Sequence, residues 1–444
     1  MPEQPPHPEA PPPRSPARAV VDVARWAVLG AASGVLAGVA CWVFLTALDR
    51  ATEARLDHPW LVWLLPLAGL AIGGAYHLFG GRAGAGNALL LDEVHRPSAW
   101  VPRRMAPMVA VGTVASHLFG ASVGREGTAL QMSGSLTDAL ARALGLRHED
   151  RRVLLTAALG AGFGAVFGVP LAGVVFGLEV QRVSWTRHLH PTSRVVWLHL
   201  VVATAAGSFV GDRVVRALGH HHVARPEVHV GIDAALLGRA ALAGVAFGLV
   251  AVAFVEATDV VRAAFRRTVG WAPARPAIGG ALVLVGVALV GRDYLGLSLP
   301  LLDEAVLGDN VSISVPLLTL AFTAVCLGSG FLGGEVTPLF VIGATTGAAV
   351  APTLGLPPLV GAAIGFVAVF GGAANTPVAC TVMAFELFGA GVVPPAAVAC
   401  VVAYLCSGRR GIYPTQRRRH GDGSVAVHDL PGLHHRLRRR PPTT

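Results

Sequence analysis

Two glutamates, Glu126 and Glu335, lie between long apolar segments, and each stands in the pattern G-x-E-x-T. An acid that follows a glycine and precedes an apolar run is typical of a helix start, where free N–H groups and the helix dipole stabilise negative charge. The same helix start binds anions, so a carboxylate there can compete with a dissolved anion. Burial disfavours the charged form of a carboxylate, so it can also carry a proton. The pattern therefore indicates either a structural helix start or an anion site with a proton carrier.

The two glutamates belong to an internal repeat. The pattern G-x-E-x-T-x-L-x-x-x-G surrounds both of them at an offset of 209 residues. Downstream, the spacing from Pro170 to Glu179 equals that from Pro377 to Glu386, at an offset of 207 residues. Two patterns at nearly one offset indicate two homologous halves, which transporters often use in inverted orientation with the substrate between them. The symmetric places of Glu179 and Glu386 favour a structural role at helix ends.

Composition and segment length predict a membrane environment. The 444 residues are 53% hydrophobic and only 14% charged, whereas soluble proteins carry about 25% charged residues. Several apolar stretches are too short for the ~20 residues of a full crossing, which is typical of helices broken in mid-membrane. We therefore predict an all-α polytopic membrane protein with many tilted and broken helices. The stretches lie near residues 26–48, 60–80, 106–122, 128–145, 153–178, 194–215, 235–258, 276–295, 314–327, 338–352, 359–371 and 377–406.

Composition also predicts the domain boundaries. Residues 1–20 are Pro-rich, which predicts a disordered arm, and residues 21–414 form the transmembrane domain, with halves at about 21–215 and 235–414. Residues 415–444 are expected to form a basic cytoplasmic tail. Arginines precede the first apolar stretch and follow the last, which predicts that both termini are cytoplasmic. All 35 basic residues are Arg, which indicates a GC-rich bacterial genome and hence the bacterial inner membrane.

Several motifs resemble those of the CLC family of chloride channels and transporters. The segment Gly124-Arg125-Glu126-Gly127 resembles the GKEGP-type motif of that family, and residues 333–338 stand where the family has a GGIFAP-type motif. The segments GREGTALQ, GGEVTPLF and GIYPTQR together are similar to its fluoride/proton antiporter branch. The resemblance spans about residues 25–415. It implies the CLC-type fold of two inverted repeats and a homodimer.

The resemblance implies a role for each matching residue. Glu126 would be the external gating glutamate. Glu335 and Thr337 would be the additional acid and hydroxyl of the fluoride branch, on the inner path of protons and fluoride. Tyr413 would border the central anion site. The other residues expected to line the anion path are Ala85, Asn87, Gly124, Arg125, Gly127 and Val336.

Departures from the chloride pattern favour fluoride. The chloride-coordinating Ser is missing, and ungapped spacing puts Ala85 in its place with Asn87 close by, so either residue could take its role. Val180 follows Glu179 where chloride antiporters carry an internal proton glutamate, which shifts the expected proton path to Glu335. Fluoride is small and strongly hydrated, so its site needs strong donors such as hydroxyls, an amide and helix N-termini.

The resemblance therefore implies a fluoride/proton antiporter that exports cytoplasmic fluoride in exchange for protons and so gives fluoride resistance. The alternative is a chloride-selective channel or chloride/proton exchanger of the same fold, which Glu335 and Thr337 disfavour. A third class, an intramembrane enzyme, is disfavoured because the sequence has no HExxH metal motif.

No cofactor or metal is expected. His220 to His222 lie in a polar loop without the spaced Cys or acidic partners of a zinc site.

Glu256 and Asp259, one turn apart at the end of an apolar stretch, are expected at the membrane interface. The net charge of +9 comes from arginines without an aromatic platform, so nucleic acid is not an expected partner. The expected partners are fluoride, protons, membrane lipid and a second copy of the chain.

Overall fold

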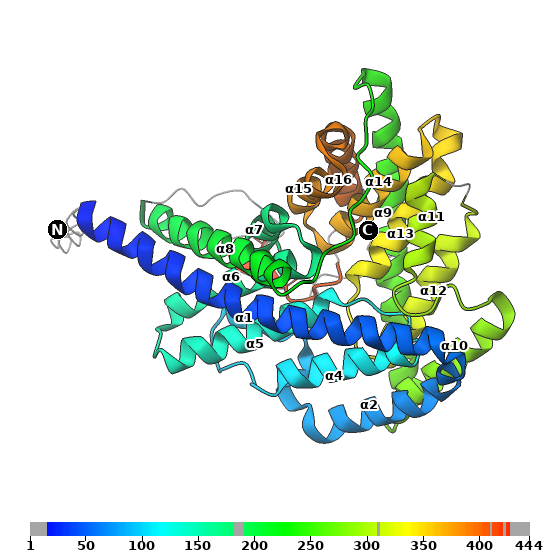
Figure 1. Cartoon of the computed structure of the whole chain (residues 1–444), viewed down its shortest axis with the longest axis horizontal. Helices are drawn as coiled ribbons and strands as arrows, with labels where there is room; N and C mark the ends of the chain where they lie inside the picture. The colour runs from blue at the N-terminus through cyan, green and yellow to red at the C-terminus, as the bar shows by residue number, and fades with distance from the viewer. Residues whose placement is uncertain (1–15, 182–190, 309–310, 409–410, 421–422, 427–444) are drawn as a thin grey trace, which may run out of the picture.

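The computed structural model describes residues 16–181, 191–308, 311–408, 411–420 and 423–426, which form a bundle of tilted helices (Figure 1). The first group of helices is α1 (Pro16–Asp57), α2 (Leu65–Phe79), α3 (Asn87–His95), α4 (Met105–Leu118), α5 (Glu126–Ala143), α6 (His148–Phe167), α7 (Pro170–Glu179) and α8 (Pro191–Ala217). The second group is α9 (Ala234–Thr268), α10 (Ala274–Val290), α11 (Leu299–Leu307), α12 (Ser314–Ser329), α13 (Val336–Leu354), α14 (Pro358–Ala374), α15 (Pro377–Phe388) and α16 (Val393–Cys406). Three 3-10 helices are η1 (Pro59–Leu64), η2 (Gly81–Ala85) and η3 (Ala390–Val392). The all-α prediction is confirmed for the bundle.

The two groups repeat one pattern of helices. Each helix from α1 to α8 has its counterpart eight helices later, and the short α3 and α11 have nine residues each. The long α1 and α9 open the two groups with 42 and 35 residues. The duplication expected from the motifs is therefore a duplication of the whole helical order.

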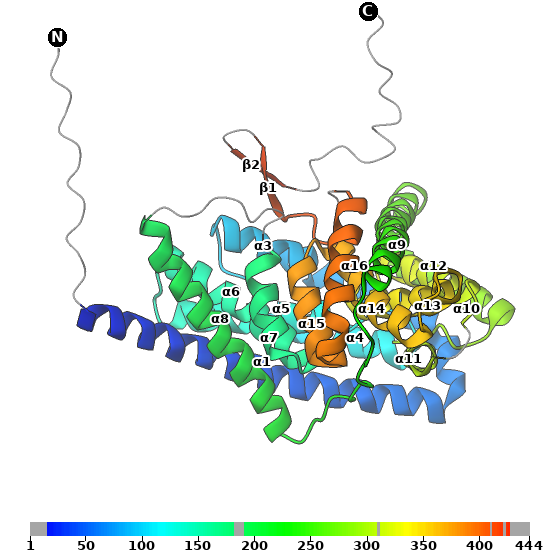
Figure 2. The ribbon, with the colours of Figure 1, turned by 90° about the horizontal axis from the view of Figure 1, so that it is seen from above.

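Reciprocal caps show that the halves are inverted. The Glu179 carboxylate, at the end of α7, accepts hydrogen bonds from the N–H groups of Val378 and Ala379 at the start of α15, at 3.1 and 2.7 Å. The Glu386 carboxylate, at the end of α15, accepts from Leu171 and Ala172 at the start of α7, at 2.8 and 2.7 Å. The two helices therefore run antiparallel, side by side in the middle of the molecule (Figure 2). The structural role expected for both glutamates is confirmed.

Glycines let the helices cross at close range. A Cβ atom on Gly38 of α1 would lie 2.7 Å from the carbonyl oxygen of Gly211 in α8, and one on Gly361 of α14 would lie 2.5 Å from that of Gly347 in α13. No side chain fits at such distances, so these helix pairs are in backbone contact. Small residues at helix crossings are typical of membrane proteins, where helices gain little from the hydrophobic effect.

Among the residues that the structure describes, five helical segments are long and apolar enough to cross a membrane, by length and composition. They are Ala17–Asp57, Pro59–Phe79, Val195–Ala217, Ala234–Thr268 and Val336–Leu354, and seven shorter apolar helices accompany them. The outer face of α1 carries exposed valines at helical spacing, among them Val35, Val39 and Val43. The apolar stretches of the sequence predict this combination of long helices with helices too short for a full crossing.

The helix and strand bounds differ in detail from the segments expected from the sequence. Helix α1 begins at Pro16, so residues 16–20, predicted to be disordered, are helical, and residues 1–15 lie outside the described part. The stretch 153–178 is two helices, because Pro170, which has no N–H to donate, starts the new helix α7. Within the tail predicted for 415–444, β1 (Arg417–His420) and β2 (Gly423–Ala426) form an antiparallel hairpin.

Candidate functional site

The two copies of the repeated motif meet at the centre of the molecule. Gly124 donates its N–H to the carbonyl of Gly334 at 2.6 Å, and Gly334 donates to the carbonyl of Gly124 at 2.7 Å. A Cβ atom on Gly334 would lie 2.8 Å from the backbone nitrogen of Gly127. The glycines of the motif therefore allow the N-terminal ends of α5 and α13 to approach each other.

Glu126 reaches from one half to the helix start of the other. Its carboxylate is fully buried and accepts hydrogen bonds from the Thr337 N–H, at 3.0 Å, from the Thr337 hydroxyl, and from the Arg125 N–H, at 3.1 Å. The Arg125 guanidinium lies 3.8 Å from the same carboxylate. The carboxylate thus occupies the N-terminus of α13, where a free anion would bind.

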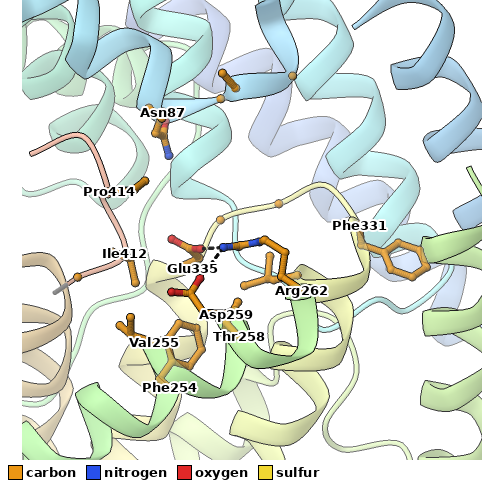
Figure 3. Close-up of a pocket in the computed structure, with 18 of the residues that line it drawn as sticks. Asn87, Phe254, Val255, Thr258, Asp259, Arg262, Phe331, Glu335, Ile412 and Pro414 are labelled. Atoms are coloured by element: carbon orange, nitrogen blue, oxygen red, sulfur yellow. Dashed lines mark hydrogen bonds and ion pairs between the residues drawn. The ribbon is translucent and has the colours of Figure 1, made fainter. Parts of the chain in front are cut away.

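Glu335 is placed differently, at the edge of a cavity of about 470 Å³ (Figure 3). Its side chain is 22% exposed, and its carboxylate lies 4.0 Å from the Arg262 guanidinium of α9. The same guanidinium donates to Asp259 at 2.8 Å. Glu126 and Glu335 thus have different surroundings. The Glu126 carboxylate is buried among hydrogen-bond donors, whereas the Glu335 carboxylate faces the cavity.

Ala85 and Asn87 both line this cavity, so the structure leaves open which of them takes the place of the missing Ser. Asn87 is the first residue of α3, after Gly86 in a left-handed conformation with φ 57°. Its amide nitrogen would lie 3.0 Å from a Cβ atom on Gly127, and its amide oxygen is buried without a hydrogen-bond partner. The amide of Asn87 thus lies beside the N-terminal end of α5.

Tyr413 is buried beside the cavity rather than in its wall. Its ring is 3% exposed and packs against Phe176 at 6.3 Å between ring centres. The segment that carries it is fixed at both ends: Ile412 donates its N–H to Ala373 at 2.9 Å, and the Gln416 amide donates to the carbonyl of Val180 at 2.9 Å. Ile412 and Pro414, on either side of Tyr413, do line the cavity.

Thr128 and Thr337 occupy equivalent places in the repeat but have different partners. The Thr128 hydroxyl lies 2.6 Å from the hydroxyl of Thr113 on α4, whereas the Thr337 hydroxyl donates to Glu126. The two halves are therefore asymmetric at the site, with a single carboxylate crossing between them.

The sequence motifs do not predict Arg262 and Asp259 as site residues. Both side chains line the cavity beside Glu335, and the place of Asp259 at the membrane interface stays a prediction. The available signal was their spacing, since Arg262 follows Asp259 by one helical turn within a largely apolar helix.

The histidine loop is packed against the protein more closely than a solvated loop would be. His221 is exposed, but the His222 ring contacts Gly168, and its Nε2 is buried without a partner. Within the described part of the chain, no three His, Cys, Asp or Glu side chains are grouped as metal ligands.

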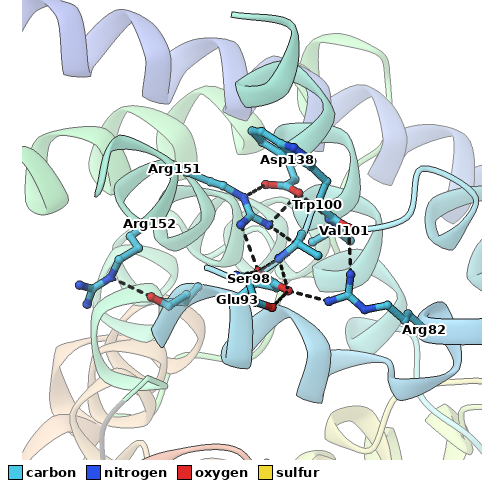
Figure 4. Close-up of polar contacts among 10 residues, drawn as sticks. Arg82, Glu93, Ser98, Trp100, Val101, Asp138, Arg151 and Arg152 are labelled. Atoms are coloured by element: carbon cyan, nitrogen blue, oxygen red, sulfur yellow. Dashed lines mark hydrogen bonds and ion pairs between the residues drawn. The ribbon is translucent and has the colours of Figure 1, made fainter. Parts of the chain in front are cut away.

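A buried ionic network holds the helices that carry the site (Figure 4). Arg151 of α6 is 2% exposed and donates to Asp138 of α5 at 2.5 Å and to Glu93 of α3 at 3.0 Å. Its guanidinium also lies 4.8 Å from the centre of the Trp100 ring. Glu93 accepts a further hydrogen bond from Arg82 at 2.6 Å. One arginine thus ties α3, which begins at the cavity, to α5 and α6.

The ionisation of Glu93 is consistent with this network. Burial on its own would raise the pKa of the Glu93 carboxyl. Hydrogen bonds from Ser98, Arg82 and Ala99 outweigh that effect and hold the pKa below its usual value. The carboxylate is therefore charged at neutral pH, as its pairing with Arg151 requires.

Replacing Arg151 with Met is expected to lower the free energy of unfolding by about 3–5 kcal/mol, because it leaves two carboxylates buried without their shared cation. Thermal unfolding of the detergent-solubilised protein measures the effect. Arg147→Met is the matched control, since Arg147 is exposed just before the same helix. Equal unfolding temperatures for Arg151→Met and the wild type would contradict this role.

Comparisons with known proteins agree on one family. A sequence model described as "Voltage gated chloride channel" matches residues 68–408. A "Chloride/fluoride channel protein" of Pseudomonas syringae pv. tomato is 46% identical over 413 residues, which cover 90% of this chain and 87% of that protein. An "H(+)/Cl(-) exchange transporter ClcA" of Cronobacter sakazakii is 28% identical over 350 residues, or 72% of each chain. The crystal structure of a CLC-type fluoride/proton antiporter superposes with a TM-score of 0.82 at 30% identity, covering 89% of this chain and 98% of that one.

Proposed function

Because the chain belongs to the voltage-gated chloride channel (CLC) family, we propose that it is a fluoride/proton antiporter that exports cytoplasmic fluoride in exchange for protons. The observation that carries the proposal is the Glu126 carboxylate, which is held by the N–H and the hydroxyl of Thr337 at the start of α13. A proton on Glu126 would weaken these hydrogen bonds and free the donors for fluoride. One side chain thereby links the movement of the anion to that of the proton.

The donors at this place suit a small, strongly hydrated anion. The Thr337 hydroxyl and the N–H groups at the start of α13 are the strong donors that dehydrated fluoride needs. The Asn87 amide nitrogen lies beside Gly127 at the start of α5. This amide and the backbone of Gly124, Gly127 and Val336 are proposed to contact the ion. The role proposed for Arg125 is to offset the charge of the site, 3.8 Å from Glu126.

Glu335 is the proposed inner proton carrier. It lies directly before α13 and faces the cavity, so it can exchange a proton with water. The last turns of α9 carry Arg262 and Arg266, which line this cavity, and Arg267, which does not. An excess of arginine favours the cytoplasmic side of a membrane, which supports a cavity open to the cytoplasm and cytoplasmic termini. Tyr413 is proposed to border the anion path between the cavity and Glu126.

A chloride-selective transporter of the same fold is the weaker alternative. The relative whose name includes fluoride is 46% identical, whereas the chloride exchanger is 28% identical. Glu335 and Thr337 add an acid and a strong donor that a soft anion such as chloride does not require. These two residues support fluoride as the transported ion.

Efflux from proteoliposomes tests the selectivity. Vesicles that contain the purified protein are loaded with fluoride or with chloride, and anion release is recorded together with external pH. We expect fluoride release with proton uptake into the vesicles and little chloride release. Chloride release as fast as fluoride release would contradict the proposal.

Replacing Thr337 with Val should lower the rate of fluoride transport about tenfold, because a hydrogen bond to a charged group contributes about 1.5–3 kcal/mol. Thr345→Val is the matched control on the same helix, since the Thr345 hydroxyl donates only to backbone carbonyls one turn earlier. Initial fluoride efflux measures both variants. Transport by Thr337→Val at the wild-type rate would exclude its hydroxyl from the fluoride path.

We further propose that the protein works as a homodimer in a bacterial inner membrane, surrounded by lipid. Exposed apolar residues on several helices, among them Leu242, Leu249 and Leu405, support contact with lipid or with a second copy. A mass that corresponds to a single chain in lipid nanodiscs would contradict the dimer.

A further inference from the structure

The cavity beside Glu335 is balanced in charge. Four charged residues are found among its described lining residues: Asp259, Arg262, Arg266 and Glu335. With all four ionised, the formal charges cancel. With Glu335 protonated, the lining has a charge of +1. The proton on Glu335 therefore decides whether the cavity is neutral or attracts anions.

Arg262 is the cation closest to Glu335. It donates to Asp259, one turn earlier on α9, at 2.8 Å, and this bond directs the guanidinium towards Glu335 (Figure 3). The gap of 4.0 Å to Glu335 is too long for a hydrogen bond. The side chain is 37% exposed, so a small anion from solution can reach it.

The described parts of the helices that pack against α9 contribute no further charged side chain near Arg262. Within their described bounds α12, α13, α14 and α16, which pack against α9, contain no Asp, Glu, Arg or His. The segments 84–88 and 411–416, which border the cavity, also contain none. The charges that face Arg262 are therefore those of Glu335, from the start of α13, and of Asp259 and Arg266 on its own helix.

We propose that Arg262, with Arg266 one turn further along α9, binds the transported anion in this cavity, and that protonation of Glu335 strengthens the binding. This inference rests on the proposed fluoride/proton antiport. Fluoride from the cytoplasm binds first at Arg262 and then moves to the hydrogen-bond donors at the start of α13. Binding is reciprocal, so an anion at Arg262 also favours the protonated form of Glu335.

The reciprocal coupling gives the cavity a function in the exchange. A proton that arrives at Glu335 from outside draws an anion into the cavity from the cytoplasm. When the proton leaves, the cavity loses its positive charge and holds the anion less tightly. The anion at Arg262 and the proton on Glu335 therefore favour each other's binding at the cytoplasmic end of the transport path, although the two ions cross the membrane in opposite directions.

Calorimetric titration of sodium fluoride into the purified protein at neutral pH tests the site. Arg262→Gln is expected to weaken fluoride binding about tenfold, since it removes a charge-assisted hydrogen bond. Arg262→Lys should restore part of the affinity. Arg267→Gln is the matched control, because Arg267 lies on the same helix but outside the cavity lining, and should bind as the wild type does. Glu335→Gln, which imitates the protonated acid, should bind fluoride more tightly than the wild type.

Wild-type affinity in Arg262→Gln, or an equal loss in Arg267→Gln, would overturn the anion site. Unchanged affinity in Glu335→Gln would overturn the coupling to the proton. If Arg262→Gln does not fold, Arg266→Gln replaces it, with a smaller expected loss. Proton-coupled fluoride efflux of the wild type is measured in parallel. If that efflux is absent, the proposed function fails; if it is present and Arg262→Gln binds normally, only this inference fails.

Discussion

Replacing Glu126 with Gln is expected to abolish the proton flux that accompanies fluoride efflux and to lower fluoride turnover at least about 100-fold, the lower range for a lost proton-transfer group. Gln keeps the size and the hydrogen-bonding oxygen of Glu, so it can remain at the start of α13 beside Thr337. It carries neither the negative charge nor the exchangeable proton. The site would then remain in the state of the neutral, protonated acid, and it could no longer alternate between a charged plug and a proton carrier.

Proteoliposome efflux with simultaneous pH recording measures this loss. Glu149→Gln is the matched control, because Glu149 is also an acid in the first turn of a helix, α6, but is exposed. The control should transport normally. Fully coupled exchange by Glu126→Gln would contradict the role of Glu126 as plug and proton carrier.

Replacing Glu335 with Gln is expected to abolish proton uptake while fluoride efflux continues at a rate about tenfold lower, a smaller loss than the about 100-fold typical of a lost proton-transfer group. Glu126 and the donors of Thr337 remain in place, so the anion path is intact. The inner proton acceptor is lost, and with it the exchange of protons with the cavity. Glu335→Gln therefore separates the two fluxes, whereas Glu126→Gln stops both.

The ratio of protons taken up to fluoride released, measured in one vesicle preparation, tests the separation. Glu304→Gln, an exposed acid on α11, serves as the control with an unchanged ratio. An unchanged ratio in Glu335→Gln would mean that the proton enters by another route.

The sequence predicts the repeat and the residues that meet because motif spacing survives duplication. The offset between Glu126 and Glu335 predicts that α5 and α13 are equivalent, and the symmetric places of Glu179 and Glu386 anticipate their reciprocal caps. These inferences depend on the spacing of the motifs and not on the exact ends of the helices. The resemblance to the fluoride branch adds roles that spacing alone does not contain, and those roles remain predictions.

Other features could not be predicted, for physical reasons. The short helices α3 and α11 have nine residues each, too few to stand out in the sequence as separate apolar stretches. The repeat pattern treats Thr128 and Thr337 alike, and only the packing decides that Thr128 bonds to Thr113 while Thr337 bonds to Glu126. The position of Arg262 beside Glu335 depends on how α9 meets α13, two segments far apart in the chain.

A transmembrane pH difference applied to proteoliposomes with equal fluoride on both sides tests the central claim most directly. Potassium and valinomycin hold the membrane potential at zero. The antiporter should move fluoride uphill into the acidic compartment, because protons leave that compartment as fluoride enters it. Passive diffusion of neutral HF carries fluoride the other way, so leak cannot imitate the result. Fluoride that stays level, or that collects on the alkaline side as it does in protein-free vesicles, would contradict proton-coupled fluoride export.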